Sequence, residues 1–245
     1  MKKETVLVLK SINADLTSYN GFKWKEKGIV KCKDFKDTKE CGNGLHGFLW
    51  GEGDGSLANW NKDAKWLVLK VDKDSIIDLD GKVKFPSCNV VFCGNRKDAT
   101  DYIILNGAKG SVIASFVISG DYGTSTSGDY GTSISGHYGT SISGYWGTST
   151  SGDNGTSTSG DNGTSTSGDY NGTSISGDRG TSISGDHGTS TSGYYGTSTS
   201  GDRGTLVIKY CDNYRYKVAV AYIGENGIEP NVAYKLDENH NFVKV

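Results

Sequence analysis

The chain has 245 residues, of which 34% are hydrophobic and 11% aromatic, and its net charge is −2. The usual hydrophobic share of a globular domain is about 45–50%, so one large aliphatic core is excluded. Disordered chains combine low hydrophobicity with high net charge and few aromatic residues, so we expect this chain to fold. The balance of 26 Lys and Arg against 28 Asp and Glu argues against nucleic-acid binding.

Residues 1–106 are expected to form a small α+β domain, because segments rich in β-branched and apolar residues alternate with glycine-rich loops. The predicted strands are residues 4–10, 66–71 and 89–93, and the predicted helix is 98–105. The N-terminal apolar run is too short for an export signal. No stretch approaches the roughly 18 apolar residues that a membrane span needs. We therefore expect a cytoplasmic protein without membrane contacts.

An octapeptide array with the pattern S-G-x-x-G-T-S-[T/I] begins at Ser119 and ends at residue 205. All eleven copies have eight residues except the seventh, which contains an inserted Asn171. Each copy offers one short strand and one turn, whereas a closed coil needs two of each. We therefore predict a β-solenoid over residues 107–205 with sixteen residues per coil. At the usual strand spacing its length is about 26 Å.

The pattern leaves open which strand face is buried. Side chains alternate along a strand, so the sixth and eighth positions (Thr, then Thr or Ile) share one face and the seventh (Ser) lies on the other. Hydrophobicity favours burial of the Thr and Ile face. The ends of the array favour burial of Ser, because we expect Val112 and Leu206 to occupy the seventh position where flanking domains cover it.

Residues 206–245 are predicted to form an antiparallel β cap. The predicted strands are residues 206–211, 216–224, 231–236 and 241–245, joined in part by N-G and N-H-N turns. A solenoid needs caps because its end coils otherwise expose free strand edges. The predicted fold is therefore mainly β: an octapeptide β-solenoid between a small α+β N-terminal domain and this cap.

The chain resembles a family of phage and prophage proteins in which an N-terminal domain of unknown function precedes S-G-x-Y-x-x-x-T octapeptide arrays. The resemblance rests on L-V-L-K-S-I-N-A-D-L-T, C-G-N-G-L-H-G-F-L-W-G-E-G-D-G and the ending G-E-N-G-I-E-P-N-V-A-Y-K-L, beside the S-G-D-Y-G-T-S-T units. It covers nearly the whole chain. It implies a phage origin and action in the cytoplasm of an infected bacterium, and it supplies no catalytic residues.

The T-x-T spacing also resembles the A-G-Y-G-S-T-x-T repeats of bacterial ice-nucleation proteins, in which stacked threonines are thought to order water. Six of the eleven units keep T-x-T, four have Ile at the second site and one has Val. The resemblance implies a water-ordering surface as one alternative function.

His46, Glu52 and Asp54 are weak candidates for a catalytic site. His46 lies in G-L-H-G-F-L-W, and a strand-borne G-L-H near the start of a small domain resembles ADP-ribosyltransferases. Those enzymes also need a late glutamate, which we do not find. A structural histidine in a glycine-rich turn is therefore the favoured interpretation.

Metal binding has only weak support. Zinc takes thiolate and imidazole ligands, but the spacing of the candidates is not that of a zinc knuckle; they are Cys32, Cys41, His46, Cys88 and Cys93. The Asp at the third repeat position lacks the register of calcium-binding β-rolls. We expect that Asp to stabilise its own turn. We expect no metal or other cofactor, and reduced thiols rather than disulfides.

The fourth repeat position is flanked by Gly, so its side chains are expected to lie on turns and to point outward. Exposed aromatic residues at regular spacing are typical of a binding surface. A self-supporting aromatic ladder that stiffens the rod is the alternative. The candidate binding residues are Tyr122, Tyr130, Tyr138, Trp146, Tyr170, Arg179, His187, Tyr195 and Arg203.

These observations favour a non-enzymatic phage-encoded binding or scaffold protein that presents its solenoid to a host protein or other macromolecule, such as a component of a defence system. The alternatives are an ADP-ribosyltransferase-like enzyme in the N-terminal domain with the array as a spacer, and an ice- or water-ordering surface. Self-association remains open.

Overall fold

The computed structural model describes residues 4–245, which divide after Ser115 into two compact units. The N-terminal unit extends beyond the expected boundary at residue 106. Val112 and Ile113 are both buried in its core, so the segment before Phe116 belongs to this unit and not to the array.

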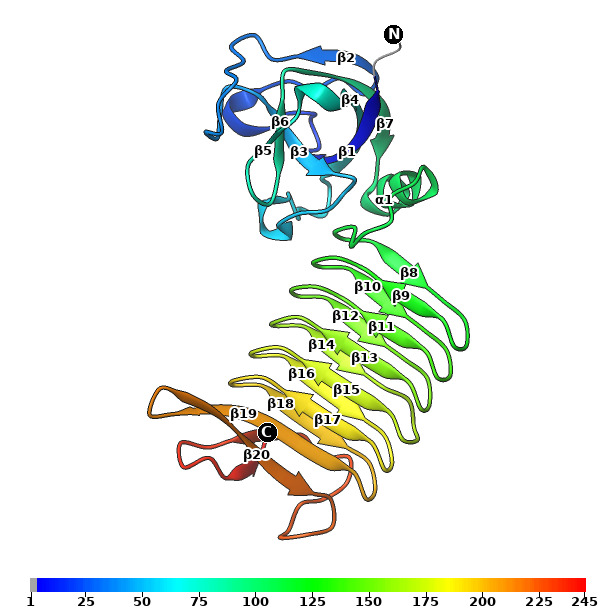
Figure 1. Cartoon of the computed structure of the whole chain (residues 1–245), viewed down its shortest axis with the longest axis vertical. Helices are drawn as coiled ribbons and strands as arrows, with labels where there is room; N and C mark the ends of the chain where they lie inside the picture. Colours follow the sequence, from blue (N-terminus) through cyan, green and yellow to red (C-terminus); the bar gives the residue numbers. More distant parts are fainter. Residues whose placement is uncertain (1–3) are drawn as a thin grey trace. The chain divides into compact units, whose positions relative to one another are not determined.

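The N-terminal unit contains a seven-stranded antiparallel sheet with the strand order β2-β7-β4-β1-β3-β6-β5 (Figure 1). The predicted strands and helix are confirmed as β1, β4, β7 and α1. The strands are β1 (Thr5–Ile12), β2 (Gly28–Lys31), β3 (Leu45–Leu49), β4 (Lys65–Asp72), β5 (Ile77–Asp78), β6 (Val83–Phe85) and β7 (Ser87–Gly94).

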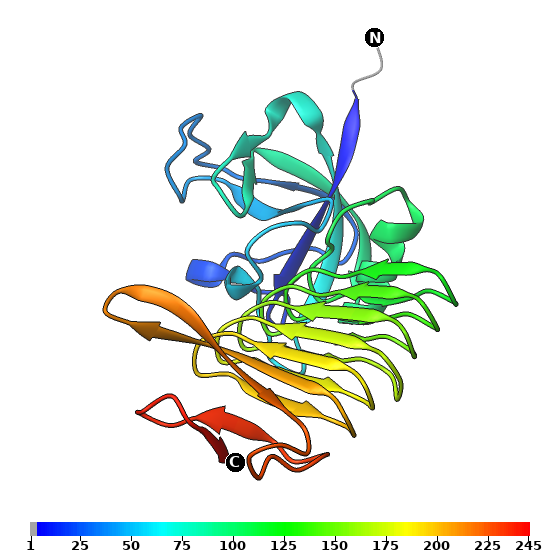
Figure 2. The ribbon, with the colours of Figure 1, turned by 60° about the horizontal axis from the view of Figure 1, so that its bottom comes forward.

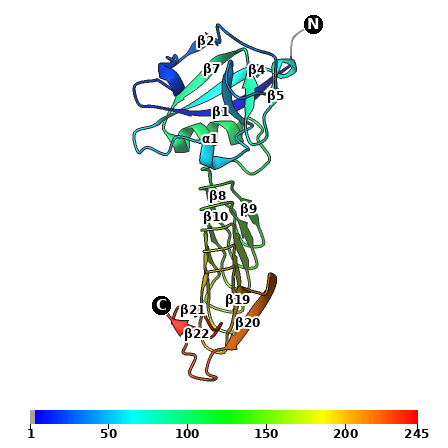
Figure 3. The ribbon, with the colours of Figure 1, turned by 90° about the vertical axis from the view of Figure 1, so that its left-hand side faces the viewer.

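The central strands of this sheet are buried on both faces. On β4, Leu67 and Leu69 face one apolar core, while Trp66 and Val68 face another. This explains why the strand is a continuous apolar run without polar alternation. Helix α1 (Arg96–Leu105) contributes Ala99 and Ile103 to the second core. Figure 3 shows this helix beside the sheet.

The second unit is a β-solenoid built from two parallel sheets (Figures 1 and 2). One sheet contains β8 (Phe116–Ile118), β10 (Thr132–Ile134), β12 (Thr148–Thr150), β14 (Thr164–Thr166), β16 (Thr181–Ser184) and β18 (Thr197–Ser200). The other contains β9 (Thr124–Thr126), β11 (Thr140–Ile142), β13 (Thr156–Ser159), β15 (Thr173–Ser176), β17 (Thr189–Ser192) and β19 (Thr205–Asp212).

The predicted lap of sixteen residues is confirmed. Thr124 pairs with Thr140 in one sheet, and Thr132 pairs with Thr148 in the other. Successive octapeptides therefore alternate between the two sheets, and each pair of octapeptides closes one coil.

The buried face of every repeat strand is the serine face. The seventh-position serines from Ser125 to Ser198 are fully buried, and those at the first position from Ser127 to Ser200 are nearly so. Hydrogen bonds cross this polar core: the hydroxyl of Ser149 donates to the carbonyl of Thr158 at 2.6 Å and shares a second hydrogen bond of 2.9 Å with the hydroxyl of Ser143. Among the described residues, the buried hydroxyls of Ser151, Ser159, Ser167 and Ser176 have no such partner. Because Ser is small, the two sheets approach closely, and a narrow hydrogen-bonded core replaces a wide aliphatic one.

The residues at the ends of the serine column correct one expectation. Leu206 pairs with Ser190 and is fully buried, as predicted. At the other end, the residue in register with Ser133 is Val117 and not Val112.

The inserted residue leaves the strand faces unchanged. Thr173, Ser174 and Ile175 remain in register with residues 156–158 of the preceding coil. Asn171, which the sequence pattern identified as the inserted residue, is not the extra one, because it takes the left-handed conformation (φ 48°) that the fourth position has in every other unit. The extra length is instead taken up just before it, at Asp169 and Tyr170.

The C-terminal cap is antiparallel, as predicted. Strand β20 (Arg215–Tyr222) pairs along the whole of β19, while β21 (Tyr234–Leu236) and β22 (Phe242–Lys244) extend the other sheet next to β18. A small apolar core around Leu206, Ile223, Ile228 and Tyr234 closes the end of the serine column. Figure 2 shows the long β19–β20 hairpin at this end of the solenoid.

Candidate functional site

Both flat faces of the solenoid present columns of Thr and Ile. Because Ser takes the inside position, the sixth- and eighth-position side chains point outward on every repeat strand. Thr124 and Thr148 are exposed, and most other threonines are half-buried because the same side chain from the next coil lies against them. The threonines therefore form ordered columns along the two faces, in which each side chain packs against its neighbours.

The longest uninterrupted T-x-T patch lies on β12 and β14. Thr148 pairs with Thr164 and Thr150 with Thr166, which places four threonines on one face. The neighbouring strands β10 and β16 carry Ile134 and Ile183 in the second column. On the opposite face, T-x-T strands alternate with T-x-I strands, so Ile142 and Ile175 separate the threonine pairs.

The turns place the fourth-position side chains on the two edges of the solenoid, as predicted. Exposed fractions are 77% for Tyr122, 53% for Trp146 and 68% for Tyr195. The fourth-position residue has a positive φ in every unit, from 48° at Asn171 to 58° at Tyr195. This conformation is uncommon for residues other than Gly and is mildly strained.

Most of the repeat glycines are required for space. A Cβ on Gly147 would lie 2.6 Å from the Cβ of Ser143, and one on Gly144 would lie 2.7 Å from the backbone nitrogen of Asp129. Glycine therefore permits the close approach of backbone within and between coils.

The aromatic residues on the edges form separate clusters of two or three rings and not one continuous ladder. Tyr122 and Tyr138 are stacked, with ring centroids 5.1 Å apart and planes 2° apart. Tyr194 and Tyr195 pack at 3.9 Å and share a hydroxyl hydrogen bond of 2.8 Å. Asn154 and Asn162 interrupt the aromatic series on both edges. Tyr170, which we expected at the fourth position, lies one residue before it and contacts the ring of His187.

The aspartates at the third position join successive coils. We expected each to stabilise its own turn, but Asp121 accepts a hydrogen bond of 2.9 Å from the backbone N–H of His137 in the next coil. Five other aspartates accept a hydrogen bond from a backbone N–H of the next coil in the same way: Asp129, Asp153, Asp161, Asp178 and Asp186. These carboxylates therefore serve the stacking of coils.

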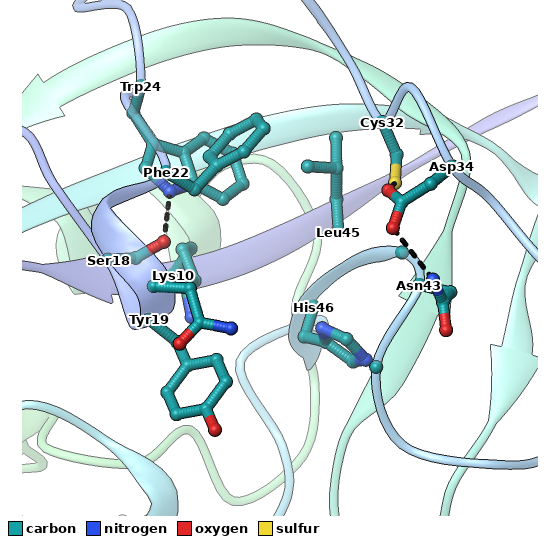
Figure 4. Close-up of a pocket in the computed structure, with 13 residues that line it drawn as sticks. Lys10, Ser18, Tyr19, Phe22, Trp24, Cys32, Asp34, Asn43, Leu45 and His46 are labelled. Carbon is teal, nitrogen blue, oxygen red and sulfur yellow. Dashed lines mark hydrogen bonds between the residues drawn. The ribbon is translucent and has the colours of Figure 1, made fainter.

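The three candidate catalytic residues do not converge. His46 lies on β3 and lines a pocket of about 470 Å³ (Figure 4). Glu52 lines a different pocket, next to Asp78 and Lys82. The carboxylate of Asp54 accepts a hydrogen bond from the backbone N–H of Ser56 at 2.9 Å and caps a short 3-10 helix.

The candidate zinc ligands are not assembled into a site. Among residues 4–245, no three His, Cys, Asp or Glu side chains lie close enough to hold a metal ion. Cys32, Cys41, Cys88 and Cys93 are free thiols, with Cys41 exposed and Cys88 buried. Burial raises the pKa of Cys88 to about 12 and also raises the pKa values of Cys32 and Cys93, which disfavours thiolate ligands. Within the same described range, no helix is long and apolar enough to cross a membrane.

Residues 6–104 match a family described as Domain of unknown function (DUF7666). The chain is also 39% identical over 120 residues to an ice nucleation protein of Pseudomonas fluorescens, which covers 48% of this chain and 10% of that protein. It is 36% identical over 106 residues to ice nucleation protein InaU of Pantoea ananas, and the match covers 42% of this chain and 10% of that protein. It is 38% identical over 105 residues to an ice nucleation protein of Xanthomonas campestris pv. translucens, and the match covers 42% of this chain and 7% of that protein. No solved structure matches the chain.

The chain therefore combines an N-terminal domain of unknown function with an octapeptide β-solenoid similar to part of the ice nucleation proteins. It spans about a tenth of the length of these relatives.

Proposed function

We propose that the solenoid binds ice and orders water through its outward-facing threonine columns. The observation that carries the proposal is the in-register T-x-T patch formed by Thr148, Thr150, Thr164 and Thr166 on β12 and β14. The similarity of the chain to ice nucleation proteins supports the same interpretation.

The patch has the geometry that an ordered water layer needs. Hydroxyl groups repeat at about 4.8 Å across the strands and roughly 6.6 Å along each strand. The methyl groups between them are apolar, so water above the face is held by regular hydroxyls and not drawn into competing charged contacts. The coil-to-coil hydrogen bonds of the aspartates keep the strands in register, which makes the array rigid.

The small size of the array favours adsorption to existing ice over nucleation of new ice. Eleven octapeptides with six T-x-T units form a small surface, and the segment that matches the relative covers only 10% of that protein. A larger surface stabilises a larger ice nucleus, so this solenoid should adsorb to existing ice more effectively than it nucleates new ice.

Incorporation of the purified protein into a slowly growing ice hemisphere tests the proposal. Thr150→Lys with Thr164→Lys should lower the fraction of protein in the ice, because two charges interrupt the patch. Asn154→Lys with Asn162→Lys adds the same charge on the turns nearby and should leave that fraction unchanged. Exclusion of the unmodified protein from ice, or equal loss in both variants, would reject the proposal.

A second candidate function uses the turn edges and not the faces. Tyr122 and Tyr138 form an exposed stacked pair, and side chains are retained at the fourth position despite a strained backbone. Under this proposal the protein is of phage origin and its edges bind a host macromolecule, for example a defence component. Replacing both tyrosines with Ser should then abolish capture of that partner from infected-cell lysate without changing incorporation into ice.

A further inference from the structure

One feature that the proposed solenoid function does not use is the pocket of the N-terminal domain around His46. It has a volume of about 470 Å³ and is lined by residues from β1, β3 and the loops before β2 and β3. Lys10 and Tyr19 line it on one side and Asp34 on the other, with His46 between them (Figure 4). Pockets of this size hold small organic ligands.

One part of this pocket carries uncompensated positive charge. Lys10 lines the pocket, and Lys82 and Lys84 lie close enough to act on the same histidine. Lys84 is fully buried, but its ammonium group bonds only to a neutral acceptor, the carbonyl of Glu40, at 2.8 Å. None of the three lysines forms an ion pair with any carboxylate of residues 4–245.

Burial and the positive charge of this part of the pocket lower the pKa values of His46 and Lys10. Burial, together with Lys82, Lys10 and Lys84, lowers the pKa of His46 from 6.5 to about 4. Burial and Lys82 lower the pKa of Lys10 from 10.5 to about 8. Both shifts indicate that the pocket disfavours further positive charge and would be stabilised by an anion.

His46 also has a polar atom without a partner. Its Nε2 is buried and has no hydrogen-bond partner among the residues that the structure describes. Buried polar groups in folded proteins are nearly always paired, so an unpaired imidazole nitrogen in a pocket points to a ligand that completes it.

The remaining walls suit a ligand with a flat ring. Tyr19 lines the pocket and yet is 88% exposed, so one face of its ring is free for stacking. Phe22 and Trp24 pack edge to face at 5.4 Å behind it, and the indole N–H of Trp24 donates to Ser18 at 2.9 Å. The carboxylate of Asp34 is already held by the thiol of Cys32 and the amide of Asn43, on the far side from Lys10.

We propose that this pocket is a binding site for a small organic anion, whose phosphate or carboxylate contacts Lys10 and His46 and whose ring stacks on Tyr19. The site is independent of the ice-binding face and gives the N-terminal domain a ligand-binding function of its own.

Nuclear magnetic resonance titration of the full chain tests this proposal with four probes: adenosine monophosphate, adenosine, inorganic phosphate and benzoate. The phosphate- or carboxylate-bearing ring compounds should shift the imidazole signals of His46 and raise its pKa, because the bound anion stabilises the imidazolium form. Adenosine monophosphate against benzoate separates a phosphate site from a carboxylate site. Adenosine alone should bind at least about tenfold more weakly than its monophosphate, because it lacks the charged contact.

Lys10→Met should weaken binding of the anionic probe by about tenfold. Lys70→Met is the matched control, because Lys70 is exposed on β4 and lines none of the pockets described above. Equal weakening in both variants overturns the proposal, and so does the absence of any His46 shift with millimolar anions. The pKa of His46 in the unmodified protein provides a readout that does not depend on whether Lys10→Met folds.

Discussion

Asp161 accepts a hydrogen bond of 2.8 Å from the backbone N–H of Asp178, which occupies the same turn position one coil further along the solenoid. Removal of this carboxylate leaves the N–H of the next coil without its acceptor. We expect Asp161→Ala to lower the free energy of unfolding of the solenoid by about 1 kcal/mol, as for one hydrogen bond in a partly exposed turn. Urea unfolding followed by circular dichroism measures this loss.

Asp202→Ala is the matched control for this substitution. Asp202 is the last aspartate of the array, and its carboxylate accepts no such bond from any residue of the described chain. Equal destabilisation by both substitutions would show that the aspartates act within their own turns.

The close packing of the serine core predicts that the stability of the solenoid depends steeply on the size of the side chains inside it. Ser149 is fully buried, so Ser149→Leu should destabilise the solenoid by about 3 kcal/mol or more through overpacking. Ser149→Ala removes only its two hydrogen bonds and should cost about 1 kcal/mol. Thr150→Leu, on the outward face of the same strand, should change stability little. Thermal unfolding of the three variants gives the order, and a neutral Ser149→Leu would be incompatible with this core.

The insertion in the seventh unit predicts a difference between two deletions that both restore an octapeptide. Deletion of Tyr170 leaves Asn171 in its left-handed conformation, whereas deletion of Asn171 forces Tyr170 into it. Asn tolerates this conformation better than Tyr, so the protein without Tyr170 should be more stable by up to about 1 kcal/mol. Parallel chemical unfolding of the two deletion variants measures the difference, and greater stability after deletion of Asn171 would be the contrary result.

Much of the solenoid was predictable because a strict period constrains the chain. The eight-residue repeat required two units per coil, and Leu206 correctly indicated that Ser faces inward. The position of Val112 was assigned wrongly because the unit before Ser119 is degenerate, and only strand pairing identifies Val117 as the residue in the serine column. A positive φ at Tyr122 or Trp146 could not be predicted, because these residue types rarely adopt it.

The pocket of the N-terminal domain was not predicted from the sequence. Lys10 and His46 lie on different strands, and only the pairing of β1 with β3 brings their segments together. The sequence signal was limited to a Gly-rich segment around His46 and a Lys at the end of an apolar strand. The buried, unpaired state of the imidazole depends on tertiary packing alone.

The low pKa of His46 predicts that the N-terminal domain loses stability in acid. In the unfolded chain the imidazole takes up a proton near pH 6.5, whereas in the folded domain it does so only near pH 4. The unfolded state therefore binds more protons within that window, and stability falls as the pH is lowered from about 6.5 to about 4. His46→Gln should flatten this dependence, which tryptophan fluorescence in denaturant can follow. The same pH dependence in the variant would exclude His46 as its source.

The most direct test of the threonine face is a gain of function. Ile134→Thr and Ile183→Thr together would extend the T-x-T columns of β12 and β14 to β10, β16 and β18 of the same sheet, without added charge. If these columns bind ice, a slowly growing ice hemisphere should incorporate a larger fraction of the double variant than of the unmodified protein under identical conditions. An unchanged or smaller fraction, from a variant with an intact β circular dichroism spectrum, would contradict ice binding by the threonine face.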